Sequence, residues 1–309
     1  ARPTRPTPLR PGAGQDGGMS PGLPDATDRT ATEPSERIDA HQHFWAMGRG
    51  DYHWMPETGR LRRDYLPPEL AELNRAAGIS GTITVQAAQT EQETDWLLAL
   101  AEHPGSMVLG VVGWAPLGTP AAGPALDRLA AHPLAVGVRP MLHDLADPAW
   151  ITRPEVVEDL ARVGQAGLTF DVLSYPGHLP HVISALEAVP DLDVVVDHLS
   201  KPAYRGGPDP DWKAWMAVLA ARPRTAVKLS GMVTEVGPGW QPADFRSHAD
   251  HALEAFGPDR VMWGSDWPVC LEAAEHAEVV GLAEDLLAGL AADEQEAVWA
   301  GTARAFYGV

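Results

Sequence analysis

The sequence predicts an α/β protein: a single (β/α)8 barrel preceded by an unstructured tail. Two observations predict this fold. Eight short segments rich in β-branched residues recur along residues 37–309, and a helical pattern follows each of them. Alternating strands and helices indicate a parallel sheet covered by helices, and eight such units over roughly 250 residues match a closed barrel better than an open sheet. No Gly-x-Gly-x-x-Gly sequence follows a predicted strand, so the usual dinucleotide-binding signature is missing.

The chain changes character at residue 36. Residues 1–36 are rich in Pro, Gly, Thr and Arg and have no hydrophobic periodicity. Such a segment cannot bury enough apolar surface to offset the entropy lost on ordering, so we expect a disordered tail. Residues 37–309 are expected to form the barrel as one domain.

The elements of the barrel follow in order along the chain. The predicted strands are Arg37–His43, Gly81–Ala87, Met107–Trp114, Ala135–Pro140, Leu168–Leu173, Asp193–His198, Thr225–Ser230 and Arg260–Ser265. The predicted helices are Pro67–Ala77, Glu91–Ala101, Pro124–Ala131, Pro154–Ala166, Leu179–Val189, Asp211–Ala221, Pro242–Phe256, Ala273–Leu290 and Ala292–Phe306. Several begin at or near proline, a favoured first-turn residue. The aromatic and charged insertion 44–66 is expected to form a loop over the barrel mouth.

The composition limits the partners of this protein. There are 23 Lys and Arg against 42 Asp and Glu, a formal net charge of −19. An acidic surface repels nucleic acid and anionic membranes, whereas a small substrate held by a few local arginines is compatible with it. Cys270 is the single cysteine and is expected to be a packed thiol. Because no long apolar run and no signal-peptide pattern is present, we expect a cytoplasmic protein. Its oligomeric state is not predicted.

Polar side chains collect where the predicted strands end. In a (β/α)8 barrel the reactive residues come from these C-terminal strand ends. His41 and His43, two residues apart on one strand, project from the same face. Alone, such a pair suits core packing as well as chemistry, but polar groups at five strand ends are costly unless they are paired or functional. The full set at the strand ends is His41, His43, Arg139, Tyr175, His178, His198 and Asp266.

These residues carry a resemblance to a known family. A His-x-His on the first strand, a histidine ending the sixth strand and an aspartate after the eighth resemble the amidohydrolase superfamily, of the amidohydrolase-2 type. More narrowly, six segments resemble its sugar-lactone hydrolase branch, which contains the L-fuconolactonases and L-rhamnonolactonases. These segments are Ile38–Trp45, Leu61–Pro67, Val85–Ala87, Gly137–Leu142, Asp197–Pro202 and Lys228–Gly231.

The resemblance implies a lactonase-type hydrolase that acts on a carboxylic ester bond. Water would attack the ring carbonyl of a sugar-acid lactone such as L-fuconolactone or L-rhamnonolactone. Asp266 would be the general base, and His198 would polarise the carbonyl. His41, His43 and Asp266 would hold one divalent metal ion, with zinc as the first candidate, or would form a metal-free proton-transfer set. A lysine-bridged pair of metals is not expected, because the fourth strand carries Arg139 and no lysine ends the fifth.

The other rim residues are expected to bind substrate. Arg139 would hold substrate hydroxyls or a carboxylate through its planar guanidinium group, or would form a structural salt bridge. Tyr175 and His178 lie on a turn at the rim. Trp45, Trp54 and Trp267 would offer flat faces to a sugar ring, or would belong to the loop core.

Two further functions stay open. A dicarboxylate-lactone hydrolase or a decarboxylase would need more cations at the mouth than Arg139, and Arg60, Arg62 and Arg63 in the insertion could supply them. A non-catalytic barrel that binds a sugar acid is less favoured, because the complete set of histidines and aspartate is present.

Overall fold

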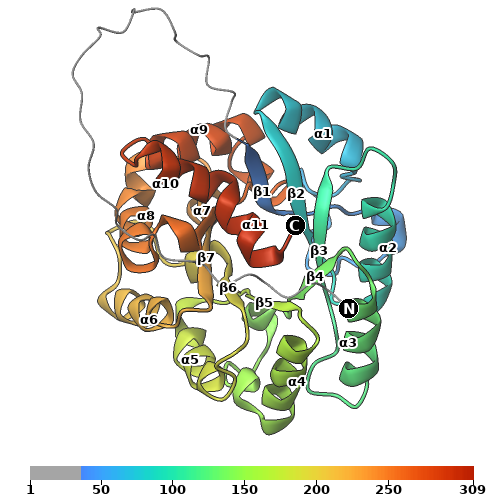
Figure 1. The fold of residues 1–309 in the computed structure, drawn as a ribbon. Helices are drawn as coiled ribbons and strands as arrows, with labels where there is room; N and C mark the ends of the chain where they lie inside the picture. Colours follow the sequence, from blue (N-terminus) through green and yellow to red (C-terminus); the bar gives the residue numbers. More distant parts are fainter. Residues whose placement is uncertain (1–35) are drawn as a thin grey trace, which may run out of the picture. The chain divides into compact units, whose positions relative to one another are not determined.

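Eight parallel strands pair in sequence order, β1 to β8, in the computed structural model, which describes residues 36–309 (Figure 1). The sheet closes on itself between β8 and β1. Gln42 pairs with Trp267 in parallel, and the His43 N–H donates to the Trp267 carbonyl at 2.7 Å. The predicted (β/α)8 barrel is therefore confirmed. Apart from Glu36, the predicted disordered tail lies outside the described residues.

The strands and helices alternate along the chain. The strands are β1 (Arg37–Gln42), β2 (Ile79–Val85), β3 (Val108–Gly113), β4 (Ala135–Val138), β5 (Thr169–Val172), β6 (Val194–Val196), β7 (Thr225–Leu229) and β8 (Val261–Trp263). The helices are α1 (Pro67–Ala76), α2 (Glu91–Ala101), α3 (Ala122–Ala131), α4 (Pro154–Gln165), α5 (Leu179–Glu187), α6 (Pro210–Ala221), α7 (Met232–Val236), α8 (Pro242–Phe256), α9 (His276–Leu287), α10 (Ala292–Glu296) and α11 (Thr302–Tyr307).

Two helical regions differ from the prediction. The short helix α7 was not predicted, because five residues are too few to show a helical period. The C-terminal helix, predicted as one element, is divided into α10 and α11 by a π-helical turn at Ala297–Gly301. In that turn Val298 and Trp299 are buried. The ring of Trp299 packs on Trp263 of β8, with 5.0 Å between ring centroids.

The barrel has two apolar regions. Inward-facing residues from the strands fill its interior, and the outer faces of the strands pack against the helices. Helix α11 belongs to the inner region: Ala303 and Tyr307 cluster with Ile38, Val112 and Val195 of the strands. Figure 1 shows α11 and the C-terminus at the centre of the ring of strands. The C-terminal helix therefore closes one end of the barrel.

Local sequence signals explain how the helices start. Thr90 caps α2 by accepting the Glu93 N–H, and Asp209 caps α6 by accepting from two backbone N–H groups. Proline occupies the first turn of α1 and α8. These residues mark the point where each loop ends and the following helix begins.

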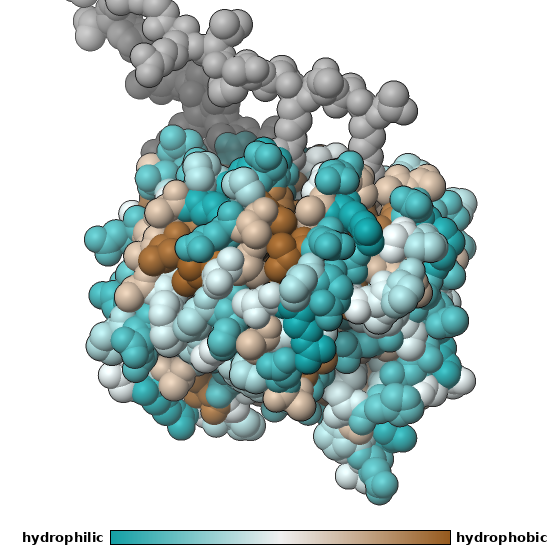
Figure 2. Space-filling view, turned by 90° about the horizontal axis from the view of Figure 1, so that it is seen from below, coloured by the Kyte–Doolittle hydropathy of each residue, from teal (hydrophilic) through white to brown (hydrophobic). Residues whose placement is uncertain are grey.

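The surface seen from below is mainly hydrophilic, with hydrophobic residues in separate patches (Figure 2). This pattern agrees with the strongly acidic composition. Within residues 36–309, no helix is both long and apolar enough to cross a membrane.

Candidate active site

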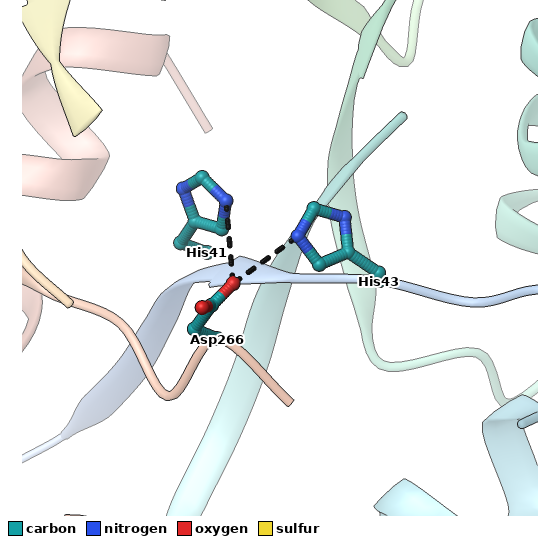
Figure 3. A group of neighbouring side chains, drawn as sticks. All are labelled: His41, His43 and Asp266. Carbon is teal, nitrogen blue, oxygen red and sulfur yellow. Dashed lines mark hydrogen bonds and ion pairs between the residues drawn. The ribbon is translucent and has the colours of Figure 1, made fainter. Parts of the chain in front are cut away.

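Three imidazoles surround one carboxylate where the barrel closes. His41 lies near the end of β1, His43 directly after it, and Asp266 three residues after the end of β8, so their side chains meet at the seam of the sheet (Figure 3). Asp266 Oδ1 is 3.3 Å from His43 Nε2, 3.8 Å from His41 Nε2 and 3.9 Å from His198 Nε2. All four side chains are buried. The structure thus brings together four of the residues that the sequence singled out.

His198 belongs to a strained segment. Residues His198–Lys201 all have positive φ, between 48° and 59°, which makes a left-handed turn of four non-glycine residues. Such a conformation costs about 1–2 kcal/mol per residue and persists only when the surroundings enforce it. The Trp212 indole N–H donates to Leu199 O at 2.8 Å, and the Ser200 hydroxyl bonds the Ser174 hydroxyl at 2.8 Å. Tertiary contacts therefore hold His198 where local preference would not.

The turn gives His198 a fixed orientation. Its Nδ1 hydrogen-bonds the Ser230 hydroxyl at 2.8 Å, which leaves Nε2 facing Asp266. Gly231 passes so close that a Cβ added to it would lie 2.5 Å from His198 Nδ1. Gly231 also has φ +65°, so glycine is needed here for both space and backbone conformation.

The hydrogen-bond partner of His43 Nδ1 determines whether Nε2 can accept or donate toward Asp266. Its Nδ1 is 2.8 Å from the carbonyl oxygen of Val85, which can only accept a hydrogen bond, so Nδ1 carries a proton. In a neutral ring, Nε2 then presents a lone pair to the carboxylate oxygen at 3.3 Å. Two lone pairs at that distance repel. A shared proton or a metal cation between His43 and Asp266 therefore suits this geometry.

His41 lies between two cations. Arg139 Nη1 is 3.1 Å from its Nε2, and Lys228 Nζ is 3.2 Å from its Nδ1. Asp197 bridges the two cations, at 3.4 Å from Arg139 and 3.0 Å from Lys228, and its Oδ1 lies 3.2 Å from His41 Nδ1. The contacts of Asp197 Oδ1 are charge contacts without hydrogen-bond alignment. Arg139 is held in addition by the Gln86 carbonyl, to which its Nη2 donates at 2.5 Å.

These contacts set the protonation of the site. Burial opposes ionisation of Asp266, but the imidazoles of His198 and His43 and the ammonium of Lys201 keep its pKa below the usual range. Burial lowers the pKa of His198 and of His41 well below the ordinary value, although nearby carboxylates oppose this. The site therefore presents an ionised carboxylate next to two neutral imidazoles.

The donor set fits one divalent metal ion. One nitrogen each from His41 and His43 and one oxygen of Asp266 lie within 4.8 Å of one another. Two imidazoles and a carboxylate, with one open position for water, are typical of catalytic zinc. Arg139 contacts the same His41 Nε2 that such an ion would use. An ion bound here would therefore share that nitrogen with the guanidinium group or displace it.

A small pocket opens above this cluster. Its volume is about 150 Å³, below the roughly 300–1,000 Å³ of sites for drug-sized ligands, so it suits a small molecule. Of the predicted substrate-binding residues, Arg139 lines it directly. Its walls are formed by His43, Trp54, Ala87, Arg139, Met141, His143, Asp144, Leu173, His198, Lys201, Asp266 and Val269.

Tyr175 and His178 lie farther out. The exposed ring of Tyr175 packs edge-on against His143, with 5.7 Å between centroids, and Lys201 Nζ lies 5.9 Å from its centre. The imidazole of His178 turns back to the backbone of Tyr175 at 3.3 Å. The structure therefore places Tyr175 on the rim beside two pocket residues, and His178 behind it.

Two of the three tryptophans that the sequence singled out do not line the pocket. Trp45 is completely buried, and its indole N–H approaches the carbonyls of Leu61 and Arg63 at 3.2 and 2.8 Å. Trp267 is also completely buried and packs edge-on against Tyr65. The loop-core alternative describes both residues, because the insertion folds back over them. The tryptophan on the pocket wall is Trp54, whose N–H donates to Ala87 O at 2.7 Å.

Sequence reasoning missed the charged residues beneath the histidines. Asp197 precedes a predicted site residue and was part of a recognised segment, but no role was assigned to it. Lys228 and Asp171 point into the barrel from β7 and β5 and are completely buried. A lysine and an aspartate within strands of otherwise apolar residues were the available signal, since such charges are rarely buried without a partner.

The arginines of the insertion are engaged elsewhere. Arg60 pairs with Glu275 at 2.7 Å, Arg63 pairs with Glu69 at 2.6 Å, and Arg62 donates to the Pro56 carbonyl. None of the three lines the pocket. The extra cations that a dicarboxylate substrate would need are not supplied by this segment.

Comparison with known proteins identifies the family. The model of the amidohydrolase family ("Amidohydrolase") matches residues 38–309. The chain belongs to the amidohydrolase family. This amidohydrolase is 38% identical over 284 residues to the L-fucono-1,5-lactonase of Burkholderia multivorans, covering 88% of this chain and 95% of that protein. It is 39% identical over 234 residues to the L-fucono-1,5-lactonase of Burkholderia ambifaria, covering 75% and 80%.

One solved structure has the same fold and contains a bound zinc ion. It is the crystal structure of an amidohydrolase from Burkholderia multivorans with bound zinc. It matches with a TM-score of 0.81 and 37% identity, covering 88% of this chain and 99% of that one.

Proposed function

We propose that this amidohydrolase is a lactonase that opens a sugar-acid lactone, with L-fucono-1,5-lactone as the first candidate substrate. The identity of 38% over 95% of an L-fucono-1,5-lactonase carries the substrate class. The chemistry rests on Asp266, an ionised carboxylate at the bottom of a small pocket beside three imidazoles.

Asp266 acts as the general base. A water molecule next to Oδ1 gives up a proton to the carboxylate as its oxygen adds to the ring carbonyl carbon. The tetrahedral intermediate then collapses, and the bond between that carbon and the ring oxygen breaks. Asp266 returns the proton to the departing ring oxygen. The open-chain acid then ionises at neutral pH, so each turnover releases one proton to solution.

The imidazoles and Arg139 stabilise the oxyanion and orient the substrate. When the Ser230 hydroxyl donates to His198 Nδ1, His198 Nε2 carries the ring proton and can donate a hydrogen bond to the carbonyl oxygen of the substrate. Arg139 offers its guanidinium group to the oxyanion or to a substrate hydroxyl. Trp54, His143 and Lys201 on the pocket wall face the rest of the sugar ring.

The proposal includes a candidate site for one divalent metal ion. His41, His43 and Asp266 would hold one divalent ion, with zinc as the first candidate, and such an ion would polarise the carbonyl and acidify the bound water. In its absence, the shared proton between His43 and Asp266 satisfies the same contacts.

A panel of aldonolactones assayed by proton release tests the proposal. The panel holds 1,4- and 1,5-lactones of L-fuconate, L-rhamnonate and their diastereomers, together with a dicarboxylate lactone. We expect turnover concentrated on one or a few sugar lactones. Rates equal to the spontaneous hydrolysis across the panel would remove the lactonase function. Preference for the dicarboxylate would favour the second candidate, although Arg60, Arg62 and Arg63 are bonded elsewhere and do not line the pocket.

A further inference from the structure

Three buried ionisable residues below the active site have no part in the proposed chemistry. Lys228 on β7 and Asp171 on β5 are completely inaccessible to solvent, and Tyr307 on α11 is nearly so. All three point into the barrel interior, where the neighbouring side chains are apolar. Buried charges in such surroundings are costly unless they are paired, and an apolar set of similar volume would serve stability as well. Their arrangement therefore calls for another explanation than stability.

The three residues form a continuous chain of contacts that ends at the active site. The Tyr307 hydroxyl donates to Asp171 Oδ2 at 2.8 Å. Lys228 Nζ donates to the same oxygen at 2.6 Å. Lys228 Nζ then lies 3.0 Å from Asp197 Oδ1 and 3.2 Å from His41 Nδ1. We call these three residues, Tyr307, Asp171 and Lys228, the axial chain.

The axial chain links the C-terminal helix to the barrel mouth. Tyr307 is the third residue from the end of the chain and lies in the helix that closes the barrel. Figure 1 shows this helix at the centre of the ring of strands. His41 is near the opposite, C-terminal end of β1. A path of polar contacts thus runs from α11 to His41 through a barrel interior that is lined mainly by apolar side chains.

The geometry at His41 indicates what the chain does. Both ring nitrogens face a cation, Arg139 at Nε2 and Lys228 at Nδ1, and the nearest acceptor is Asp197 Oδ1 at 3.2 Å from Nδ1. Ammonium and guanidinium groups can only donate, so each ring nitrogen of His41 is approached by a donor, and these two contacts fix the plane of the ring. Lys228 also lies 3.0 Å from Asp197 Oδ1 and so holds the carboxylate that faces Nδ1.

We propose that Lys228, held from below by Asp171 and Tyr307, is a positioning residue that fixes the orientation of the His41 ring. His41 Nε2 is thereby kept 3.8 Å from Asp266 Oδ1. The C-terminal helix is thereby part of the catalytic framework. This inference rests on the proposed lactonase function for its kinetic consequence, while its structural consequence stands apart from any substrate.

The test removes one hydroxyl group at the far end of the chain. Tyr307→Phe deletes the hydrogen bond to Asp171 and keeps the aromatic packing. The matched control is Tyr204→Phe, because the Tyr204 hydroxyl is equally buried but has no hydrogen-bond partner among the described residues. Lys228→Met and Lys228→Arg remove or displace the cation itself. Each protein is labelled with ¹⁵N-histidine, and the ring signals of His41 are assigned by their loss in His41→Asn.

We expect Tyr307→Phe to lower kcat by about tenfold with an unchanged KM, because it loosens Asp171 and through it Lys228, the outer partner of His41, and losing such a partner costs about 10–100-fold. Its His41 ring-nitrogen signals should shift from their wild-type positions, and Tyr204→Phe should change neither quantity. Lys228→Met should have the larger effect, and Lys228→Arg should restore part of it. If Lys228→Met does not fold, Tyr307→Phe decides alone.

The outcomes separate this inference from the proposed function. A folded Tyr307→Phe with wild-type His41 signals and wild-type kcat overturns the positioning role. If the wild-type protein hydrolyses no lactone, the lactonase proposal fails, but the His41 signals still decide whether the axial chain positions the His41 ring.

Discussion

Asp39 and Ser265 are joined by two hydrogen bonds: the Ser265 N–H donates to Asp39 Oδ1 at 2.9 Å and its hydroxyl donates to Oδ2 at 2.5 Å. Asp39 Oδ1 also accepts the His41 N–H at 3.1 Å. Each partner comes just before a site residue, since Asp39 precedes His41 by two positions and Ser265 precedes Asp266 by one. One buried carboxylate thus ties the two strands that carry the proposed base and the first histidine.

The first prediction concerns the general base. Asp266→Asn keeps the size and the polar contacts of the side chain but cannot accept a proton from water. We expect kcat to fall by about 10²–10⁴-fold with substrate binding retained. Steady-state kinetics and calorimetric binding of the product acid measure the two quantities. Asp127→Asn, an exposed residue on α3, is the control. Undiminished turnover by Asp266→Asn would remove Asp266 from the mechanism.

A second prediction concerns the metal ion. We expect wild-type protein to bind one zinc ion per chain and His43→Asn to bind it at least about tenfold more weakly, because one of three ligands is lost. Elemental analysis and competition with a chromophoric chelator measure this. His103→Asn, on an exposed loop, should bind zinc as wild type does. Full activity in a metal-free preparation would reassign His41 and His43 to positioning the water.

The third prediction uses two glycines that both have positive φ. Gly231 (φ +65°, ψ 0°) and Gly237 (φ +78°, ψ −177°) flank α7, and alanine at either costs about 1–3 kcal/mol of folding free energy. Only at Gly231 does the new Cβ strike His198. We expect Gly231→Ala to lower kcat by about 10²-fold, because a small displacement of a reacting group has that effect. Gly237→Ala should lose stability alone. Equal kcat values in the two variants would contradict this prediction.

A fourth prediction separates two tryptophans. Trp54 lines the pocket and is 40% exposed, whereas Trp45 is fully buried. We expect Trp54→Phe to raise KM several-fold with little change in stability. Trp45→Phe should instead lower the free energy of unfolding by about 2 kcal/mol, because it leaves the carbonyls of Leu61 and Arg63 without their donor. Urea denaturation and steady-state kinetics on both variants are the measurements, and a raised KM in Trp45→Phe alone would reverse the assignment.

The last prediction concerns pH and Glu93. Burial raises the pKa of this carboxyl to about 7, although it accepts hydrogen bonds from the N–H groups of Ala87 and Ala88. The folded protein therefore holds a proton that the unfolded chain releases near pH 4.5. The free energy of unfolding should fall as pH rises from 4.5 to about 7, by up to about 3 kcal/mol from this group.

Glu93→Gln tests that sign. The variant has no titrating group at this position, so its stability should depend less on pH between 5.5 and 8 than that of the wild type. Urea unfolding at several pH values measures the difference. Glu158→Gln, at an exposed position on α4, should keep the wild-type slope. Parallel slopes for wild type and Glu93→Gln would show that Glu93 is already ionised in the folded protein.

The sequence determined the barrel and its reactive rim, because both are written in local patterns. Short segments rich in β-branched residues followed by amphipathic helices specify strands and helices, and a closed parallel barrel brings all strand ends to one rim. His41, His43, His198 and Asp266 could be singled out for that reason, before any distance was known.

Only the tertiary structure decided how those residues are held. The left-handed turn at His198–Lys201 contradicts local preference and exists because Trp212 and Ser174 enforce it. The burial of Trp45 depends on a loop folding back across it. Lys228 and Asp171 meet from strands 57 residues apart in sequence. Contacts between distant segments depend on the closed barrel, and no local sequence pattern encodes them. The charges and burial around His41 and Asp266, and therefore their chemistry, are set by these tertiary contacts.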